Sequence, residues 1–311
     1  MVSRQRCLFV ADPLEKLKPA SDSTLAILRE AQARGWQSYW TTPDTLSFQN
    51  GDVCVRARLV AAARPETLPS TATEQSFTVA DFALVFVRKD PPFDTKYLRM
   101  CWWLGLEEKR TTIVNSPSVL VRFHEKLVPW EAVSHGFLKK EQLVPTYTAD
   151  MDGVHALLEA YPEKDYVMKP LFGFAGSAVE RWNGGTLAAV EPQLAQPFQK
   201  AIHTRGDRRV LYAYGKRIGD FARRPPEGGF VSNLAAGGYA EDLPMTESER
   251  AAADALGKFL ESVGIAFAGA DLIGDKVSEV NITSPTGLMS VEKLSKTNCA
   301  ALFWDELAKR L

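Results

Sequence analysis

A carboxylate and an amide lie two residues apart in a short apolar segment near the end of the chain, at Glu279 and Asn281. If this segment is a strand, the two side chains point the same way. Asp271 precedes a tight-turn signal, Gly274-Asp275, so it can face the same side from a paired strand. Buried carboxylates are rare unless they are paired or bind metal. These oxygen donors suit Mg²⁺, with phosphate oxygens and water as further ligands, although a polar, solvent-facing edge strand would show the same spacing.

Two lysines, Lys126 and Lys169, each adjoin an apolar segment. Small residues follow the second lysine, with Gly173, Gly176 and Ser177 among them. Such a segment lets backbone N–H groups approach phosphates, while a lysine supplies a point charge. The order of residues is not that of a Walker A loop, and a glycine-containing turn between two strands remains the alternative.

Arginines gather at the ends of a predicted hairpin around Gly215. Asp207-Arg208-Arg209 begins one arm and Arg223-Arg224 ends the other, so pairing would bring them to one end of a sheet. Guanidinium groups there could bind phosphate or carboxylate. Arg208 and Arg223 face opposite to their neighbours, and we expect them to be solvated.

The elements that must position these groups begin with a βαβ pattern, which predicts a parallel sheet. Residues 7–11 and 37–41 are predicted strands, and the helix between them starts at the cap Ser21-Asp22 and ends before Gly35. The apolar run Phe82–Val87 predicts a central buried strand. It leads into Arg88-Lys89-Asp90, at the sheet edge where open α/β sheets bind ligands.

The rest of the chain is predicted to alternate between loops, strands and helices. A loop of about fourteen residues at 225–238, rich in Pro and Gly, has the length of a functional lid. The other predictions are a strand or hairpin arm at 53–60, a loop at 64–78, strands at 111–114 and 165–168, a helix that contains 124–127, a helix at 246–263, strands at 266–273 and 276–282, and a helical end.

Composition limits the class of protein. The 311 residues are 45% hydrophobic, enough for two or three modules, and carry 37 Lys and Arg against 38 Asp and Glu. This balance disfavours a nucleic-acid or membrane partner. Four cysteines lie far apart, at 7, 54, 101 and 299, and no stretch approaches a transmembrane length. A cytoplasmic protein is expected.

The sequence motifs, in their order along the chain, resemble those of the prokaryotic glutathione synthetase family of the ATP-grasp superfamily. The resemblance covers nearly the whole chain. The motifs that carry the resemblance are Asp12-Pro13, Glu30-Ala31-Gln32, Arg88-Lys89-Asp90-Pro91-Pro92-Phe93-Asp94, Asn115-Ser116-Pro117, Glu125-Lys126-Leu127, Lys169-Pro170-Leu171, Gly206-Asp207-Arg208-Arg209-Val210, Asn233-Leu234-Ala235-Ala236-Gly237-Gly238, Asp271-Leu272-Ile273-Gly274-Asp275 and Glu279-Val280-Asn281-Ile282-Thr283-Ser284-Pro285-Thr286.

The resemblance implies an α/β fold of the α+β ATP-grasp type: an N-terminal α/β domain at 1–122 and two ATP-grasp subdomains at 123–200 and 201–311 that enclose ATP. It implies an ATP-dependent carboxylate–amine ligase with an acyl-phosphate intermediate, which in the family joins γ-glutamylcysteine to glycine. The implied cofactors are ATP and Mg²⁺, with Mn²⁺ as an alternative. The implied partners are small molecules, a dipeptide or an amino acid, and a homo-oligomer is expected.

The resemblance also assigns roles to individual residues. The expected catalytic residues are Arg209, Arg224 and Asn233. The expected metal ligands are Asp271, Glu279 and Asn281. The expected ATP-binding residues are Lys126, Lys169, Gly173, Gly176, Ser177, Gln196, Phe198 and Gln199. The expected substrate-binding residues are Arg88, Asp90, Ser284, Pro285 and Thr286.

Several positions depart from the family pattern. Phe172 stands where the family has Asp, Ala175 where it has Gly, and Val231-Ser232 where it has an Arg before Asn233. Met289 and Ser290 replace an Arg and a Glu, and the hinge is one residue longer. Loss of arginines removes bidentate anchors. Three functions therefore stay open: glutathione synthesis, the same chemistry on another acid or amine, and a non-catalytic ATP sensor.

Overall fold

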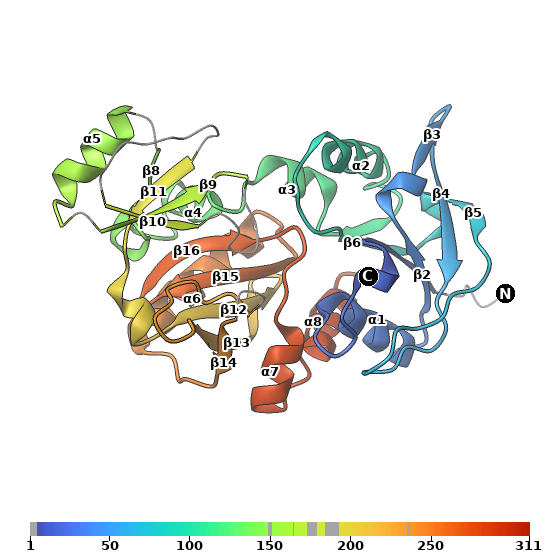
Figure 1. Ribbon diagram of the computed structural model, residues 1–311. Helices are drawn as coiled ribbons and strands as arrows, with labels where there is room; N and C mark the ends of the chain where they lie inside the picture. Colours follow the sequence, from blue (N-terminus) through green and yellow to red (C-terminus); the bar gives the residue numbers. More distant parts are fainter. Residues whose placement is uncertain (1–4, 149–150, 164, 173–178, 184–192, 235–236) are drawn as a thin grey trace.

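The computed structural model describes residues 5–148, 151–163, 165–172, 179–183, 193–234 and 237–311. Three sheets follow one another along the chain, each with helices packed on it (Figure 1). Short 3₁₀ helices connect the larger elements at Leu14–Lys16, Pro43–Thr45, Val79–Asp81, Lys140–Gln142 and Lys200–His203.

The N-terminal sheet has the strand order β3-β4-β2-β1-β6-β7, with β5 paired to β4. Its strands are β1 (Arg6–Ala11), β2 (Gln37–Thr41), β3 (Ser47–Gln49), β4 (Asp52–Leu59), β5 (Gln75–Thr78), β6 (Leu84–Arg88) and β7 (Thr112–Val114). β1 pairs in parallel with β2 and β6, and β6 with β7, which confirms the predicted parallel arrangement. The buried runs of β1 and β6 hold its centre together because both faces of these strands are covered.

Local capping explains the first helix, α1 (Ser23–Ala33). The Asp22 side chain accepts a hydrogen bond of 2.8 Å from the backbone N–H of Leu25, as an N-cap should. Gly35, just past the end, has a φ of 84° that favours glycine. Two further helices, α2 (Thr95–Gly105) and α3 (Pro117–Arg122), follow in the N-terminal part.

The middle of the chain forms a smaller antiparallel sheet of order β10-β9-β11-β8. Its elements are β8 (Tyr147–Thr148), α5 (Met151–Ala160), β9 (Tyr166–Pro170), β10 (Glu180–Trp182) and β11 (Gln193–Pro197), preceded by α4 (Val128–Ser134).

The third sheet is antiparallel throughout, with the order β14-β13-β12-β15-β16. It contains β12 (Asp207–Ala213), β13 (Lys216–Arg224), β14 (Tyr239–Glu241), β15 (Phe267–Ile273) and β16 (Lys276–Asn281), together with α6 (Glu247–Ser262). Gly215 and Gly274 occupy the two predicted tight turns, each with positive φ. The last helices are α7 (Leu288–Ser295) and α8 (Cys299–Ala308).

The end of the chain returns to the N-terminal sheet, where α8 lies beside α1 (Figure 1). The Trp304 indole N–H donates to the carbonyl of Ile27 at 3.0 Å, and Arg34 pairs with Asp305 at 2.7 Å. Asn115, just after β7, donates to the carbonyls of Phe267 and Ile282 at 2.6 Å each. The first and third sheets are thus joined by buried contacts.

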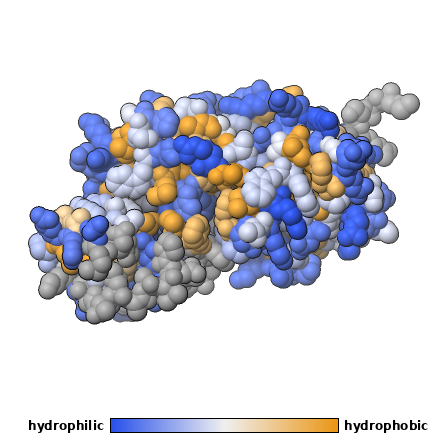
Figure 2. Space-filling view, turned by 90° about the horizontal axis from the view of Figure 1, so that it is seen from above, coloured by the Kyte–Doolittle hydropathy of each residue, from blue (hydrophilic) through white to orange (hydrophobic). Residues whose placement is uncertain are grey.

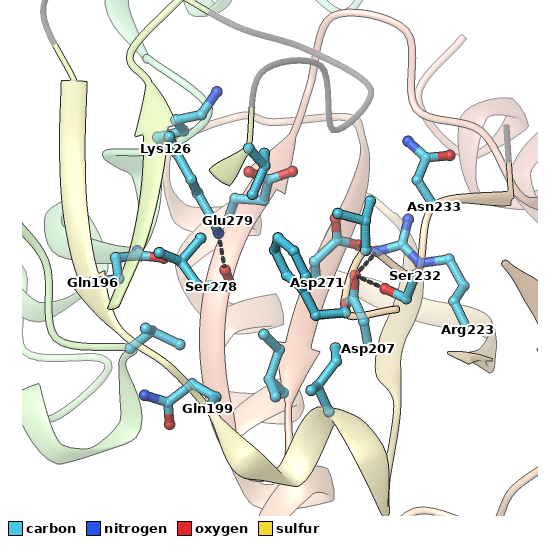
Figure 3. Close-up of a pocket in the computed structure, with 18 of the residues that line it drawn as sticks. Lys126, Gln196, Gln199, Asp207, Arg223, Ser232, Asn233, Asp271, Ser278 and Glu279 are labelled. Atoms are coloured by element: carbon cyan, nitrogen blue, oxygen red, sulfur yellow. Dashed lines mark hydrogen bonds and ion pairs between the residues drawn. The ribbon is translucent and has the colours of Figure 1, made fainter. Parts of the chain in front are cut away.

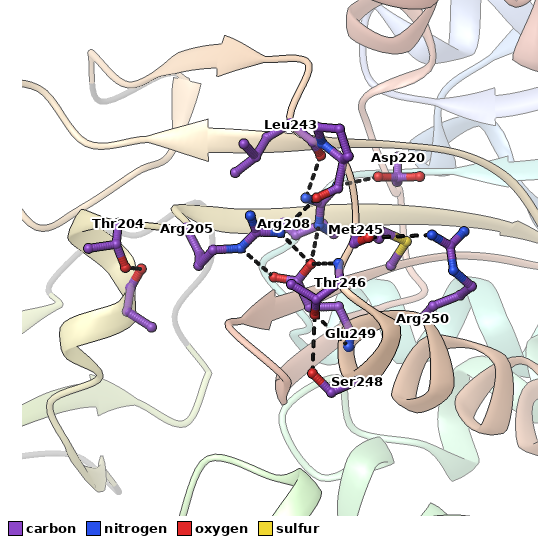
Figure 4. Close-up of polar contacts among 12 residues, drawn as sticks. Thr204, Arg205, Arg208, Asp220, Leu243, Met245, Thr246, Ser248, Glu249 and Arg250 are labelled. Carbon is purple, nitrogen blue, oxygen red and sulfur yellow. Dashed lines mark hydrogen bonds and ion pairs between the residues drawn. The ribbon is translucent and has the colours of Figure 1, made fainter.

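A buried ion cluster anchors α6 to the third sheet (Figure 4). Glu249 completes a capping box with Thr246 and accepts two hydrogen bonds from Arg205, at 3.0 and 2.7 Å. Arg208, only 1% exposed, pairs with Asp220 and donates to the carbonyl of Leu243. The expectation that Arg208 is solvated is therefore wrong, because it neutralises carboxylates beneath the sheet.

Two element predictions need correction. The segment 64–78 is not entirely loop, since Gln75–Thr78 pairs with β4 as an edge strand that has little apolar pattern of its own. His124-Glu125-Lys126-Leu127 lies before α4 rather than inside a helix. Pro129 explains this start, since proline is favoured in the first turn of a helix.

Candidate active site

A pocket lies between the second and third sheets, and residues from both line it (Figure 3). β9 and β11 border one side, and β12, β13, β15 and β16 form the other. The lining includes Glu125, Lys126, Lys169, Gln196, Phe198, Gln199, Asp207, Arg209, Arg223, Phe230, Ser232, Asn233, Asp271, Ser278, Glu279 and Asn281.

The three expected metal ligands meet in this pocket. Asp271 pairs directly with Glu279 across the β15–β16 ladder, so the two carboxylates share a face. The Asn281 amide N–H donates to Asp271 Oδ2 at 3.2 Å, which brings its carbonyl oxygen into the same group. The turn at Gly274-Asp275 and strand alternation produce the arrangement that the sequence predicted.

A bulge in β16 adds a group that alternation did not predict. Glu279 faces Asp271, but Val277 faces Leu272, so Ser278 is the extra residue between them. Val277 stays in the core while Ser278 turns toward the pocket. Its hydroxyl accepts a hydrogen bond of 3.1 Å from the ammonium of Lys169. β9 and β16 are therefore connected at the bottom of the pocket.

Two guanidinium groups hold Asp271. Arg209 donates Nε and Nη2 to its two carboxylate oxygens at 2.6 and 3.0 Å, and Arg223 contacts Oδ1 at 2.8 Å. Burial alone would raise the pKa of Asp271, but these two arginines outweigh it and lower the pKa to about 2. The carboxylate is thus kept ionised, as a metal ligand must be.

Arg223 also reaches a second carboxylate, Asp207, at 2.5 Å. Burial raises the pKa of Asp207 to about 6 despite this partner. The expectation that Arg223 is solvated is wrong, since it is 7% exposed and lines the pocket. Asp207 and Arg223 are site residues that the sequence reasoning missed.

Arg224, one of the two expected catalytic arginines, does not line this pocket, whereas Arg209 does. Its Nε contacts Glu241 at 2.5 Å and its Nη1 donates to the carbonyl of His203 at 3.1 Å. The reason is a one-residue shift of the β12–β13 register between Leu211 and Tyr212, which places Arg223 on the face of Arg209. The geometry thus favours Arg223 over Arg224 for a role in this pocket.

The residues expected at the adenine side lie together along the opposite wall. Gln196 in β11 is buried and donates to the hydroxyl of Thr146 at 2.9 Å. Gln199 donates to the carbonyl of Pro197 at 2.9 Å. The ring of Phe198 packs under the guanidinium of Arg181, 3.7 Å from its centroid. This wall therefore presents amide groups and an aromatic ring, which are groups that can contact a purine ring.

The described part of the predicted lid also reaches the pocket. Phe230, Ser232 and Asn233 line it, and the Ser232 hydroxyl donates to Asp207 Oδ2 at 3.1 Å. The residues at 235–236 lie outside the described part, as do Gly173, Gly176, Ser177 and Ala175 in the expected phosphate segment. Their roles remain predictions.

The expected substrate residues form a separate cluster between the first and third sheets. Arg88, 4% exposed, donates to the Thr24 hydroxyl at 3.0 Å and to the carbonyl of Pro285 at 2.8 Å. Arg209 donates to the carbonyl of Thr286 at 3.0 Å, which ties this turn to the pocket. Asp90 lies on the surface, and its N–H donates to Asp12. Contact of these residues with substrate stays a prediction.

Glu125 fixes the segment before Lys126 onto the metal-ligand strand. Its Oε1 accepts hydrogen bonds from the N–H groups of Ile282 and Thr283 at 2.7 and 2.9 Å and from the Thr283 hydroxyl at 2.9 Å. The N–H of Val280 donates to the Glu125 carbonyl at 3.0 Å. Lys126 is thereby held at the same pocket as Glu279. Residue spacing could not predict this contact, because its partners lie far apart along the chain.

The donor set fits a hard divalent cation. Among the described residues no three His, Cys, Asp or Glu side chains gather as a metal group; here two carboxylates are joined by an amide. Such a set leaves coordination positions for phosphate oxygens and water, which is typical of Mg²⁺ sites that also hold a nucleotide. With lysines and arginines around it, the pocket is built for phosphoryl transfer.

Comparisons with known proteins agree with this geometry. Residues 6–121 match the family described as prokaryotic glutathione synthetase, N-terminal domain, and residues 138–296 match prokaryotic glutathione synthetase, ATP-grasp domain. Among solved structures, the fold resembles D-cycloserine synthetase DcsG, with a TM-score of 0.67, 17% identity and coverage of 98% of this chain and 99% of that one. It also resembles a D-alanine–D-alanine ligase from Bacillus anthracis complexed with ATP, with a TM-score of 0.55, 9% identity and coverage of 98% and 96%.

Fold and site together define an ATP-grasp enzyme, an ATP-dependent ligase that acts on small-molecule substrates. The chain belongs to the prokaryotic glutathione synthetase family. It is 36% identical to a glutathione synthetase from Parasynechococcus marenigrum (strain WH8102), with 98% of each chain covered. It is 34% identical to one from Escherichia coli (strain K12), with 97% and 98% covered. ATP-grasp ligases use ATP and a divalent metal.

Proposed function

We propose that this ligase joins the cysteinyl carboxylate of γ-glutamylcysteine to the amine of glycine, with ATP converted to ADP and phosphate. The observation that carries the proposal is the convergence of Asp271, Glu279 and Asn281 with Lys126 and Lys169 in one pocket. Full-length relatives named glutathione synthetase support the choice of substrates.

In the first step, a carboxylate oxygen of the dipeptide attacks the γ-phosphorus of ATP, ADP leaves, and an acyl phosphate forms. Lys126, Lys169 and Arg209 are placed to neutralise the phosphate charge, and Arg223 adds a fourth cation. When bound, Mg²⁺ held by Asp271, Glu279 and Asn281 would neutralise phosphate oxygens and align them, and Mn²⁺ could take its place.

In the second step, the glycine amine attacks the acyl carbon and inorganic phosphate leaves with the former carboxylate oxygen. Water must be excluded meanwhile, because it would hydrolyse the acyl phosphate. The loop 225–238 is proposed to cover the pocket, and the Ser232–Asp207 hydrogen bond supports that position for its described part.

The remaining assignments are proposals too. We propose domains at 1–122, 123–200 and 201–311, a homo-oligomer, and action without nucleic acid. Free cysteines at 7, 54, 101 and 299 support a reducing compartment, and hence a cytoplasmic location. Separately, no helix in the described part of the chain has the length and apolar character needed to cross a membrane.

A second candidate function is the same chemistry on a different acid. Phe172, which stands where the family has Asp, exposes 52% of its surface and lines a cavity together with Lys126. A coupled assay of ADP release separates the candidates. Turnover with γ-glutamylcysteine and glycine at ordinary rates supports the first. Turnover with another acid–amine pair alone supports the second, and tight ATP binding without any turnover would indicate a sensor.

A further inference from the structure

A second cavity opens beside the nucleotide pocket, with a volume of about 650 Å³ including its mouth. Three segments meet there: the loop before α2, the end of α3, and the residues that follow β9. Its apolar lining consists of Pro91, Phe93, Val121, Phe123, Leu171 and Phe172. The enclosed part, about 140 Å³, is large enough for one side chain of a bound molecule.

Apolar side chains at this cavity are unusually open to solvent. Phe172 is 52% exposed and Val121 is 41% exposed. From above, apolar residues lie among hydrophilic ones along the middle of the molecule (Figure 2). Covering such surface with an apolar group is favourable because it removes that surface from water.

The polar groups at the cavity are largely engaged by the protein itself. Both terminal nitrogens of Arg122 donate to Glu131, at 2.7 and 3.1 Å. Glu125 is bound by the backbone of β16. His124 lies edge-on to Phe172, and burial lowers its pKa, so the ring is neutral at pH 7. The cavity therefore presents a mainly apolar surface to a ligand, with Lys126 on the side that it shares with the nucleotide pocket.

Glu125 and Lys126 line both cavities, so the second cavity adjoins the nucleotide pocket. In the ligase reaction the acyl donor's carboxylate must lie at the phosphate end of the nucleotide, near Lys126 and Glu279. The side chain on the carbon next to that carboxylate must then lie within a few ångströms of it. Among the described cavities, this one adjoins that position.

We infer that this cavity binds the side chain of the acyl-donor residue and selects for an apolar one, an inference that rests on the proposed ligase function. A cysteine side chain fits it without filling it, and longer alkyl side chains fit as well. A charged side chain would lose its hydration against the apolar lining. Phe172 and Val121 are thus specificity-determining residues.

The test measures kcat/KM for ADP release with ATP, glycine and three dipeptides: γ-glutamylcysteine, γ-glutamylleucine and γ-glutamylaspartate. The unaltered protein should use the leucyl dipeptide within about tenfold of the cysteinyl one and the aspartyl dipeptide about 100-fold less well. Phe172→Asp and Val121→Asp should each lower the leucyl-to-cysteinyl ratio about tenfold. Phe172→Lys should raise the relative use of the aspartyl dipeptide.

Phe48→Asp is the matched control, because Phe48 is 48% exposed on β3 and lines neither cavity. It should leave the ratios of kcat/KM between the three dipeptides unchanged. The KM for ATP should be unchanged in every variant. If the Phe172 and Val121 variants turn over with the same kcat/KM ratios between dipeptides as the unaltered protein, the inference is overturned and the proposed function stands. Absence of ADP release with all three dipeptides would instead contradict the proposed function, and the inference with it.

Discussion

Charge at the centre of the site is balanced residue by residue. Asp271 is bound by Arg209 and Arg223, and Glu279 adjoins it across the ladder. Among the described residues, the pocket as a whole is lined by equal numbers of cations and carboxylates: Lys126, Lys169, Arg209 and Arg223 against Glu125, Asp207, Asp271 and Glu279. A bound nucleotide would add negative charge to this balance, so a divalent cation would be needed with the lysines to offset it during phosphoryl transfer.

Glu279→Gln keeps the shape of the side chain and removes its charge. We expect kcat to fall by about 100-fold or more, because a hard cation would lose one of two carboxylate ligands. The melting temperature should change little. Steady-state kinetics over a range of Mg²⁺ concentrations check this, with the exposed Glu261→Gln as control. Substantial activity in Glu279→Gln would exclude the metal assignment.

Arg223 and Arg224 offer a matched pair of neighbours. Arg223→Lys should lower kcat about 100-fold, because a lysine cannot contact Asp207 and Asp271 as the guanidinium does. Arg224→Lys should stay within about threefold, because it changes a pair with Glu241 outside the pocket. The rates of ADP release by the two variants test which of the two arginines acts in the pocket. Equal losses would contradict the assignment of Arg223.

At the level of elements, the sequence predicted the hairpins but not their registers. The turns at Gly215 and Gly274 could be predicted because glycine is favoured where a turn needs a positive φ, and both residues have one. An unbroken β12–β13 ladder would place Arg224 on the face of Arg209; the shift near Leu211 exchanges it for Arg223. Ser278 likewise turns inward at a bulge. A bulge depends on packing between distant elements, so local alternation could not reveal either residue.

The Glu249 cluster gives a pH-dependent prediction for α6. Burial would raise the pKa of Glu249, but its hydrogen bonds with Arg205 dominate and lower it. A lowered folded-state pKa stabilises above the unfolded pKa, and this contribution is lost as pH falls through the folded pKa. Glu249→Gln should therefore cost about 1–3 kcal/mol of unfolding free energy at pH 7, and less at pH 4.

Urea denaturation at the two pH values measures this difference. Glu247→Gln is the control, since Glu247 is exposed in the same first turn. A cost of Glu249→Gln that is the same at pH 4 and pH 7 would show that the ion pair with Arg205 is not its source.

For the whole molecule, the resemblance predicted two subdomains that enclose a nucleotide, and the pocket does lie between the second and third sheets. The contacts between sheets were not predicted. Asn115 donates to the carbonyls of Phe267 and Ile282 and accepts from the N–H of Phe267 at 2.7 Å. Arg88 and Pro285 are nearly two hundred positions apart yet share a hydrogen bond. Such pairs have no periodicity in the sequence, which is why their partners could not be predicted.

Asn115→Ala tests the coupling of the first and third sheets. It leaves three backbone groups without their buried partner, so we expect a loss of about 3 kcal/mol in unfolding free energy. Ser118→Ala, at an exposed position of α3, should cost little. Calorimetry should show a lower melting temperature for Asn115→Ala alone. An unchanged melting temperature would contradict the coupling.

The central claim is that a carboxylate is phosphorylated in this pocket before the amide forms. The most direct measurement supplies γ-glutamylcysteine labelled with ¹⁸O in its cysteinyl carboxylate, together with ATP, Mg²⁺ and glycine. Mass spectrometry of the released inorganic phosphate should find one ¹⁸O transferred for each amide formed, with ADP as the nucleotide product. Amide formation with unlabelled phosphate, or with AMP carrying the label, would contradict an acyl phosphate and the role proposed for this site.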